Sequence, residues 1–223
     1  MQSGQSLRGR STFLSNNFLT PSPQLPAADP LPSLPIMCTT RLQLDLLLND
    51  SVIDLKAVTE VILADAGATL QILRLIGEEF PNVDERPKRI EDCIVSLSPA
   101  RCYQTVCSSE APHAGPHVAE WQHCRRLAEC ARELARNLEG FAPEEAYLVG
   151  LLSRIGTFPQ LLGWKGSDSL SQEADALGVM LACHWNLPQC VLSAIRERHG
   201  MEPSPKWTNI LSLAHQLIEQ PSV

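Results

Sequence analysis

The chain has 223 residues, a mass of 24.5 kDa and a formal net charge of -7, so it is long enough to bury the core of one large domain. Its acidic balance argues against a protein that mainly binds nucleic acid or an anionic membrane, because both partners require excess Lys and Arg. The sequence has neither a run of about 20 apolar residues nor a secretory signal, and we therefore expect a cytoplasmic protein.

The first 30 residues differ in character from the rest. They are rich in Ser, Pro, Gln and Asn without sustained periodicity, which predicts a disordered tail. Apolar periodicity begins near Leu31, and residues 31–220 are predicted to form one helical domain. A translation start at Met37 is an alternative origin for the tail, although it would discard the Leu31–Pro35 block.

Helix starts follow in chain order through the first half of this domain. A leucine-rich run at residues 42–48 predicts the first helix. Asp54 and Asp65 stand where a carboxylate can cap the helix that follows each of them. Pro87 and the Ser98–Pro99 pair predict the first turns of two more helices, because proline has no N–H to leave unpaired there.

The second half opens with the longest periodic segment. Apolar residues alternate by three and four from His117 to Leu138, which predicts a long amphipathic helix. Later boundaries are predicted at Pro143, Gly156, Ser169 with Gln172, Pro188, Gly200 and Ser204–Pro205. No alternating strand pattern occurs. The predicted fold class is therefore all-α, a compact bundle of about ten helices.

The eight cysteines include no C-x-x-C pair, and several lie among apolar residues at helical spacing. We expect reduced thiols packed as small hydrophobic side chains. The basic pairs Arg125–Arg126 and Arg132–Arg136 can in principle meet phosphates. Charges on one helix face are more commonly solvated and paired, here with Glu129 or Glu133.

Several blocks resemble the HDOD domain, a bacterial relative of the HD metal phosphohydrolases. The run Phe141–Gly156 resembles the family's signature helix, and Asp65–Leu75 resembles its segment Asp-Pro-x-Leu-Thr-x-x-Leu-Leu-Arg-Leu. The other matching blocks are residues 31–35, 121–124, 177–181, 185–188 and 194–199. The resemblance spans about residues 31–220 and implies an HD-like multi-helix bundle.

The departures from the family pattern concern the metal ligands. HD hydrolases use a first histidine, an adjacent His-Asp pair and a later aspartate. The resemblance places His123 at the first of these and Ser153–Arg154 at the pair. Three further positions of the pattern also differ in this chain. Ala174 stands where the family usually has a histidine, Arg198–His199 stands where it has a His-His pair, and His215 stands where it often has Asp or Asn. His123 and, in part, His199 remain.

Arginine in place of the bridging aspartate disfavours a metal. Two unit charges about 4 Å apart interact by roughly 4 kcal/mol at an effective dielectric of about 20, so a divalent ion would lose about 8 kcal/mol of attraction and meet similar repulsion. A lone histidine cannot supply the three or four ligands of a hydrolytic ion. The resemblance with this departure implies no catalytic residues, no metal and no cofactor.

Two interpretations of the altered pocket stay open. If His123, Arg154, Arg198 and His199 converge, they suit an anionic ligand such as a nucleotide phosphate. Alternatively, Arg154 forms an internal salt bridge and only fills space, and His123 is a satisfied core residue. The candidate salt-bridge partners in the sequence are Glu144, Glu145, Glu173 and Asp175.

Three functions follow from these readings. The first, which the resemblance favours, is a non-catalytic regulator that binds a signalling protein of a two-component or cyclic-dinucleotide pathway. The second is a nucleotide or cyclic-dinucleotide binding module that uses the remodelled cavity. The third is a phosphohydrolase with unusual ligation, which bound metal would reveal. The sequence does not predict the oligomeric state.

Overall fold

A computed structural model describes residues 34–109, 115–163, 174–198, 200 and 206–220, and of Ala174 and Asp175 only the backbone. Within these ranges every regular element is helical, which confirms the predicted all-α class. No helix in the described ranges is long and apolar enough to cross a bilayer.

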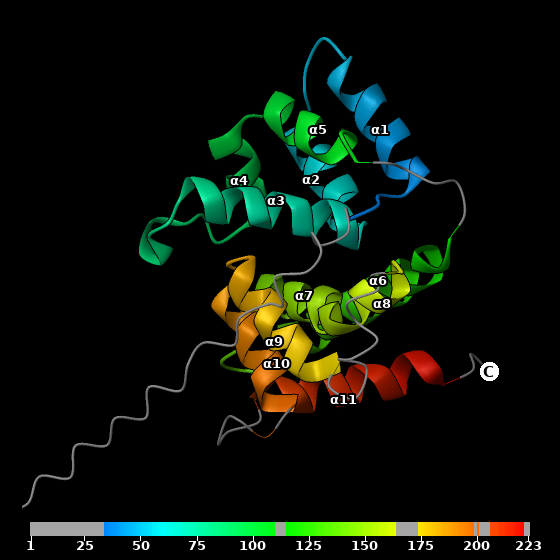
Figure 1. The fold of residues 1–223 in the computed structure, drawn as a ribbon, viewed down its shortest axis with the longest axis vertical. Coiled ribbons are helices and arrows are strands. Elements are labelled where there is room, and N and C mark those ends of the chain that lie inside the picture. The colour runs from blue at the N-terminus through cyan, green and yellow to red at the C-terminus, as the bar shows by residue number, and fades with distance from the viewer. Residues whose placement is uncertain (1–33, 110–114, 164–173, 199, 201–205, 221–223) are drawn as a thin grey trace, which may run out of the picture.

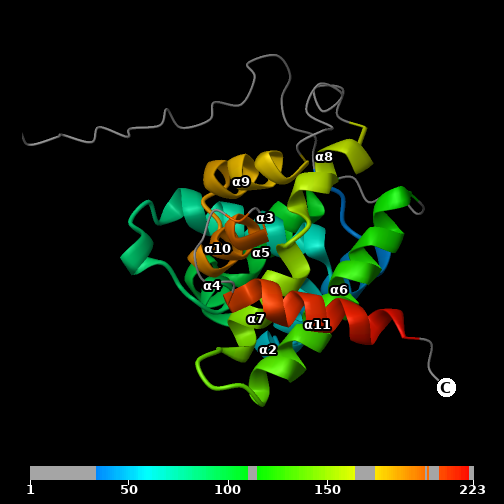
Figure 2. The ribbon, with the colours of Figure 1, turned by 90° about the horizontal axis from the view of Figure 1, so that it is seen from below.

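Figure 1 shows two layers of helices. The first layer contains α1 (Cys38–Leu48), α2 (Leu55–Leu63), α3 (Ala66–Glu79), the 3-10 helix η1 (Val83–Glu85), α4 (Ile90–Leu97) and α5 (Pro99–Cys107). The second contains α6 (Pro116–Arg136), α7 (Pro143–Leu152), η2 (Ile155–Thr157), α8 (Phe158–Leu161), α9 (Ala174–His184), α10 (Gln189–Arg198) and α11 (Lys206–Glu219). Figure 2 shows α11 lying along α6.

Three predicted helix starts are confirmed by their hydrogen bonds. The Asp54 carboxylate accepts from the backbone N–H groups of Lys56 and Ala57, and Asp65 caps α3 in the same way. The Ser98 hydroxyl accepts from the N–H of Arg101, with Pro99 in the first turn of α5. Side-chain caps therefore set these boundaries, as their spacing predicted.

Other predicted boundaries were wrong or are not described. Pro87 precedes α4, which starts at Ile90 because the carbonyl of Arg89 accepts the first helical bond, from the N–H of Cys93. Gly156 does not end α7, which stops at Leu152; it lies in η2, where α9 packs closely against it. The signals at Ser169–Gln172 and Ser204–Pro205 fall outside the described residues.

The long helix α6 differs slightly from its predicted range of 117–138. It starts with Pro116 and ends at Arg136, and the side chain of Leu138 is largely exposed. Both apolar cores include residues of this helix: Trp121 and Ala128 contribute to the larger core and Leu127 to the smaller one, which α7, α10 and α11 complete. Helix α6 is thus the central element of the second layer.

The extended segment at residues 34–37 joins the two layers. Leu34 and Ile36 are buried in the larger core. The carbonyl of Leu34 accepts from the side-chain amide of Gln71 at 2.8 Å, and the N–H of Met37 donates to the Asp65 carboxylate at 2.6 Å. From the other layer, the indole N–H of Trp121 donates to the carbonyl of Pro35 at 3.3 Å.

The contact between α6 and α7 depends on a glycine. A Cβ on Gly150 would lie 2.6 Å from the Cα of Ala128, and real Cβ atoms do not approach backbone that closely. The cysteines are free thiols, as predicted, although Cys183 is exposed rather than packed. Burial raises the pKa of Cys93 and of Cys124 to about 12, which keeps both thiols protonated and unreactive.

Candidate functional site

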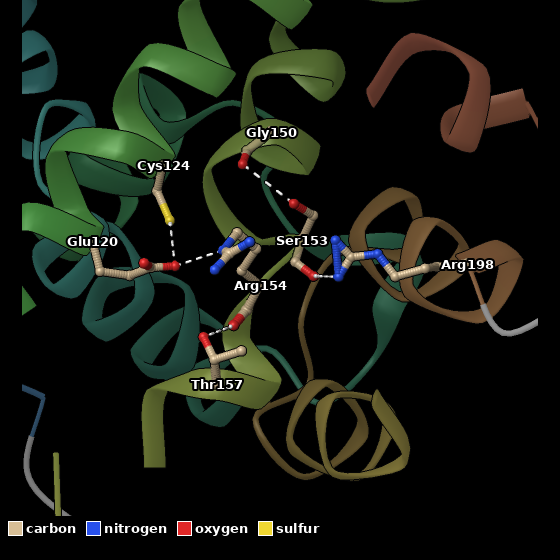
Figure 3. A network of polar contacts seen from close by, with 7 residues as sticks. All are labelled: Glu120, Cys124, Gly150, Ser153, Arg154, Thr157 and Arg198. Atoms are coloured by element: carbon tan, nitrogen blue, oxygen red, sulfur yellow. Dashed lines mark hydrogen bonds and ion pairs between the residues drawn. The ribbon is translucent and has the colours of Figure 1, made fainter. Parts of the chain in front are cut away.

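The Ser153–Arg154 pair, which the sequence analysis singled out, lies where α7 ends. Arg154 follows the last residue of α7 by two positions, and its Nε donates to Oε1 of Glu120 on α6 at 2.6 Å (Figure 3). The Glu120 side chain is 18% exposed and that of Arg154 is 32% exposed. The guanidinium and the carboxylate therefore neutralise each other in a partly buried position.

Backbone bonds hold Arg154 in this place. Ser153 caps α7 through its N–H, which donates to the carbonyl of Val149, and its hydroxyl contacts the carbonyl of Gly150. The hydroxyl of Thr157 donates to the carbonyl of Arg154 at 2.9 Å. Hydrogen bonds on both sides thus fix the backbone of the turn between α7 and η2, from which the Arg154 side chain reaches Glu120 on α6.

A second arginine reaches the same turn from α10. Nη1 of Arg198 lies 3.4 Å from the carbonyl oxygen of Ser153, and Figure 3 shows Arg154 and Arg198 on two sides of that residue. The Sγ of Cys124, one turn after Glu120 on α6, is 4.0 Å from the carboxylate oxygen that Arg154 contacts. Two guanidinium groups, those of Arg154 and Arg198, therefore lie beside this turn, and the Glu120 carboxylate pairs with the first of them.

Two histidines complete the surroundings of this turn. His123 on α6 and His215 on α11 have ring centroids 5.5 Å apart, and Nε2 of His123 is buried without a hydrogen-bond partner among the described residues. Burial lowers the pKa of His123, and the positive charge of Arg154 lowers it further. The pKa of His215 is lowered by burial, by His123 and by both arginines. Both rings are therefore neutral near pH 7.

These side chains do not fit a hydrolytic metal ion. The carboxylate closest to His123 along α6, Glu120, is already paired with a guanidinium. Among the residues that the structure describes, no group of three or more His, Cys, Asp and Glu side chains is arranged to hold an ion. A catalytic divalent metal needs at least three such donors around an open position.

One known protein family matches this chain. The sequence profile of the HDOD domain matches residues 31–163, more than half of the chain. The chain belongs to the HDOD domain family. HDOD domains are degenerate relatives of the HD phosphohydrolases.

Solved structures with a similar fold include the MmoQ response regulator of Methylococcus capsulatus str. Bath. The match to one MmoQ structure has a TM-score of 0.67 at 21% sequence identity, and it covers 83% of this chain and 86% of the MmoQ chain. A fragment spanning residues 20–298 of MmoQ has a TM-score of 0.64 at 20% identity, covering 85% and 87%. Such identities establish a shared fold alone. No curated protein sequence matches this HDOD chain.

Some of the predicted site residues of this HDOD domain lie close together in the structure. His123 lies near Arg154, and Arg198 contacts the same turn, whereas His199 and the side chain of Ala174 fall outside the described residues. The convergence of these side chains on a bound ligand remains a proposal.

Arg154 forms an ion pair, but its partner is none of the predicted acids. Glu144 and Glu145 are exposed in the first turn of α7. About ten residues of helical rise, roughly 15 Å, separate them from Arg154 at the other end of that helix. The carboxylate of Glu173 and that of Asp175 are not described.

The sequence contained a signal for one residue near this turn that the prediction overlooked. Glu120 lies three positions before His123 on α6, so both side chains share one helix face. His215, which the sequence analysis had named from the resemblance, has its ring beside that of His123 in the structure. Glu120, an acidic residue one helical turn before His123, was therefore the signal in the sequence that pointed to the ion pair.

Proposed function

We propose that this HDOD domain is a non-catalytic regulator of bacterial signal transduction that acts by binding a protein partner. The observation that carries the proposal is the 2.6 Å ion pair between Arg154 and Glu120. The family resemblance implies that Arg154 stands where the HD phosphohydrolases have a metal-binding aspartate. The ion pair therefore links α6 to the end of α7 and has a structural role.

Electrostatics supports a structural role for the ion pair between Arg154 and Glu120. A divalent ion beside His123 would face the guanidinium of Arg154, and repulsion at about 4 Å amounts to roughly 8 kcal/mol for a double charge at a dielectric of about 20. Displacing Arg154 would also leave Glu120 without its partner. Both effects oppose ion binding and therefore hydrolysis.

The signalling role rests on family membership and on fold. A structure of similar fold is described as a response regulator, MmoQ, which places that fold in a signalling protein. Scaffolds are reused for unrelated functions, so the partner has to be identified by experiment. We expect it to be a component of a two-component or cyclic-dinucleotide pathway.

The catalytic part of the proposal is tested with the full chain and added Mn²⁺ or Mg²⁺. We expect substoichiometric bound metal and hydrolysis of bis(p-nitrophenyl) phosphate at the rate of the protein-free blank, with no difference between the natural chain and the His123→Ala variant. Turnover that disappears in His123→Ala would show a working metal site and refute the proposal. Affinity capture from the native bacterium then tests for a stoichiometric signalling partner.

A second candidate function is the binding of a nucleotide at the same turn, through His123, Arg154 and Arg198, with His199 close in sequence. The buried Nε2 of His123, which has no partner among the described residues, favours it. The anion would have to compete with Glu120 for Arg154, which makes this the weaker candidate. We expect any thermal stabilisation by nucleotides at this site to be lost in Arg154→Ala. No stabilisation at millimolar nucleotide would contradict it.

A further inference from the structure

A separate cleft of about 250 Å³ lies between the two helical layers. Its walls come from α2, the start of α4, α6 and α7, which Figure 2 shows near one another on the side of the molecule away from α9. The cleft is lined by five basic side chains, Lys56, Lys88, Arg89, Arg132 and Arg136, and by three carboxylates, Glu60, Glu91 and Glu144. It thus carries two surplus positive charges in a chain whose net charge is -7.

Not all of this positive charge is neutralised internally. Arg89 and Arg136 each pair with a nearby glutamate, at 3.3 and 2.5 Å. None of the ion pairs formed among the described residues involves Lys56, Lys88 or Arg132. The predicted pairing of the basic residues of α6 therefore holds for Arg136 but not for Arg132.

Arg132 is held on the wall of the cleft by stacking. Its guanidinium carbon lies 4.8 Å from the centre of the Tyr147 ring, and its Nε is buried without a hydrogen-bond partner among the described residues. Tyr147 is itself fixed, because its hydroxyl donates to the carbonyl of Leu63 at 2.9 Å and its ring is 5% exposed. Stacking on a ring orients a guanidinium and leaves its N–H groups to bind an anion in its plane.

We propose that this cleft binds a compact phosphorylated small molecule, with Arg132 as the main contact and Lys56 and Lys88 as supporting charges. A phosphate monoester carries about -1.5 to -2 charges near neutral pH and would be attracted by the three basic side chains of the cleft that form no ion pair among the described residues. Arginine and lysine together favour phosphate, the first by paired hydrogen bonds and the second as a point charge.

The volume of the cleft further limits which phosphorylated molecules can bind. Pockets for drug-sized ligands measure roughly 300–1,000 Å³, so about 250 Å³ suits a mononucleotide or a smaller phosphate ester better than a cyclic dinucleotide. Because both layers contribute walls, such a ligand would connect α2 and α4 with α6 and α7. The site lies apart from the Arg154 turn, and its existence does not depend on the regulatory role proposed above.

The proposal is tested by calorimetric titration of the full chain with AMP and pyrophosphate, with adenosine as the probe that lacks phosphate. We expect AMP and pyrophosphate to bind, adenosine not to bind, and affinity to fall as NaCl is raised. Arg132→Gln is expected to weaken binding at least about tenfold, the usual scale for a charge-assisted hydrogen bond. Lys88→Gln, an exposed change, should weaken binding by a smaller factor.

Arg125→Gln is the control for net charge, because it removes one charge from the same helix at a position paired with Glu129. This variant is expected to bind AMP as the natural chain does. Absence of AMP binding up to about 10 mM, or equal binding by Arg132→Gln and Lys88→Gln, would overturn the proposal.

Discussion

A chain that begins at Met37 is expected to lose at least about 4 kcal/mol of folding free energy. It lacks Leu34 and Ile36, which are 2% and 0% exposed, and burial of each such side chain contributes about 2 kcal/mol. It also leaves the side-chain donors of Gln71 and Trp121 without their carbonyl acceptors. The new ammonium group of Met37 would pair with Asp65 and offset part of this loss.

Thermal unfolding measures this effect. For a chain of this size, about 4 kcal/mol corresponds to a fall in Tm of roughly 8–16 °C. A chain that begins at Leu31 keeps the whole segment and is the matched control, and it should melt close to the full chain. Equal melting temperatures for the two shortened chains would mean that the segment at residues 34–36 contributes nothing to the core.

Gly150→Ala is expected to destabilise the domain although alanine is the better helix former. The added Cβ would lie 2.6 Å from Cα and 2.8 Å from N of Ala128, and backbone atoms cannot move aside without separating α6 from α7. Overpacking of this kind costs about 1–3 kcal/mol, which exceeds the gain of about 1 kcal/mol in helix propensity. The expected result is a lower denaturant midpoint in equilibrium unfolding.

Gly178→Ala provides the matched control for this prediction. Gly178 is also buried in a helix, but its added Cβ would lie 3.4 Å from Ile195 and 3.5 Å from Gly156, which are ordinary contacts. Alanine there should leave stability unchanged or raise it. If both variants unfold at the same midpoint, the close approach of α6 and α7 is not what requires glycine at position 150.

The Gly150 prediction bears on function, because the contact between α6 and α7 positions the Arg154 turn. Glu120 lies on α6 and Arg154 follows α7, so the ion pair exists only while these helices are in register. Gly150 sets their separation four residues before Arg154. A variant that separates the helices should therefore disturb the regulatory site together with stability.

The sequence by itself determined the helical class, the family and several helix starts. Asp54, Asp65 and Ser98 act through neighbours two or three residues away, and such local hydrogen bonds can be read from spacing. The proposal that Arg154 stands in place of an acidic metal ligand likewise comes from the sequence, since it concerns one residue type in a motif that resembles the family's.

Only the tertiary structure decided which side chains meet. Glu120 is 34 residues from Arg154, whereas Glu144 and Glu145, two acids nearer in sequence, are exposed at the far end of α7. Arg132 and Arg136 share one helix, yet one stacks on Tyr147 while the other pairs with Glu133. Side-chain partners across helices depend on how close the helices approach and on their rotation, which local sequence spacing does not encode.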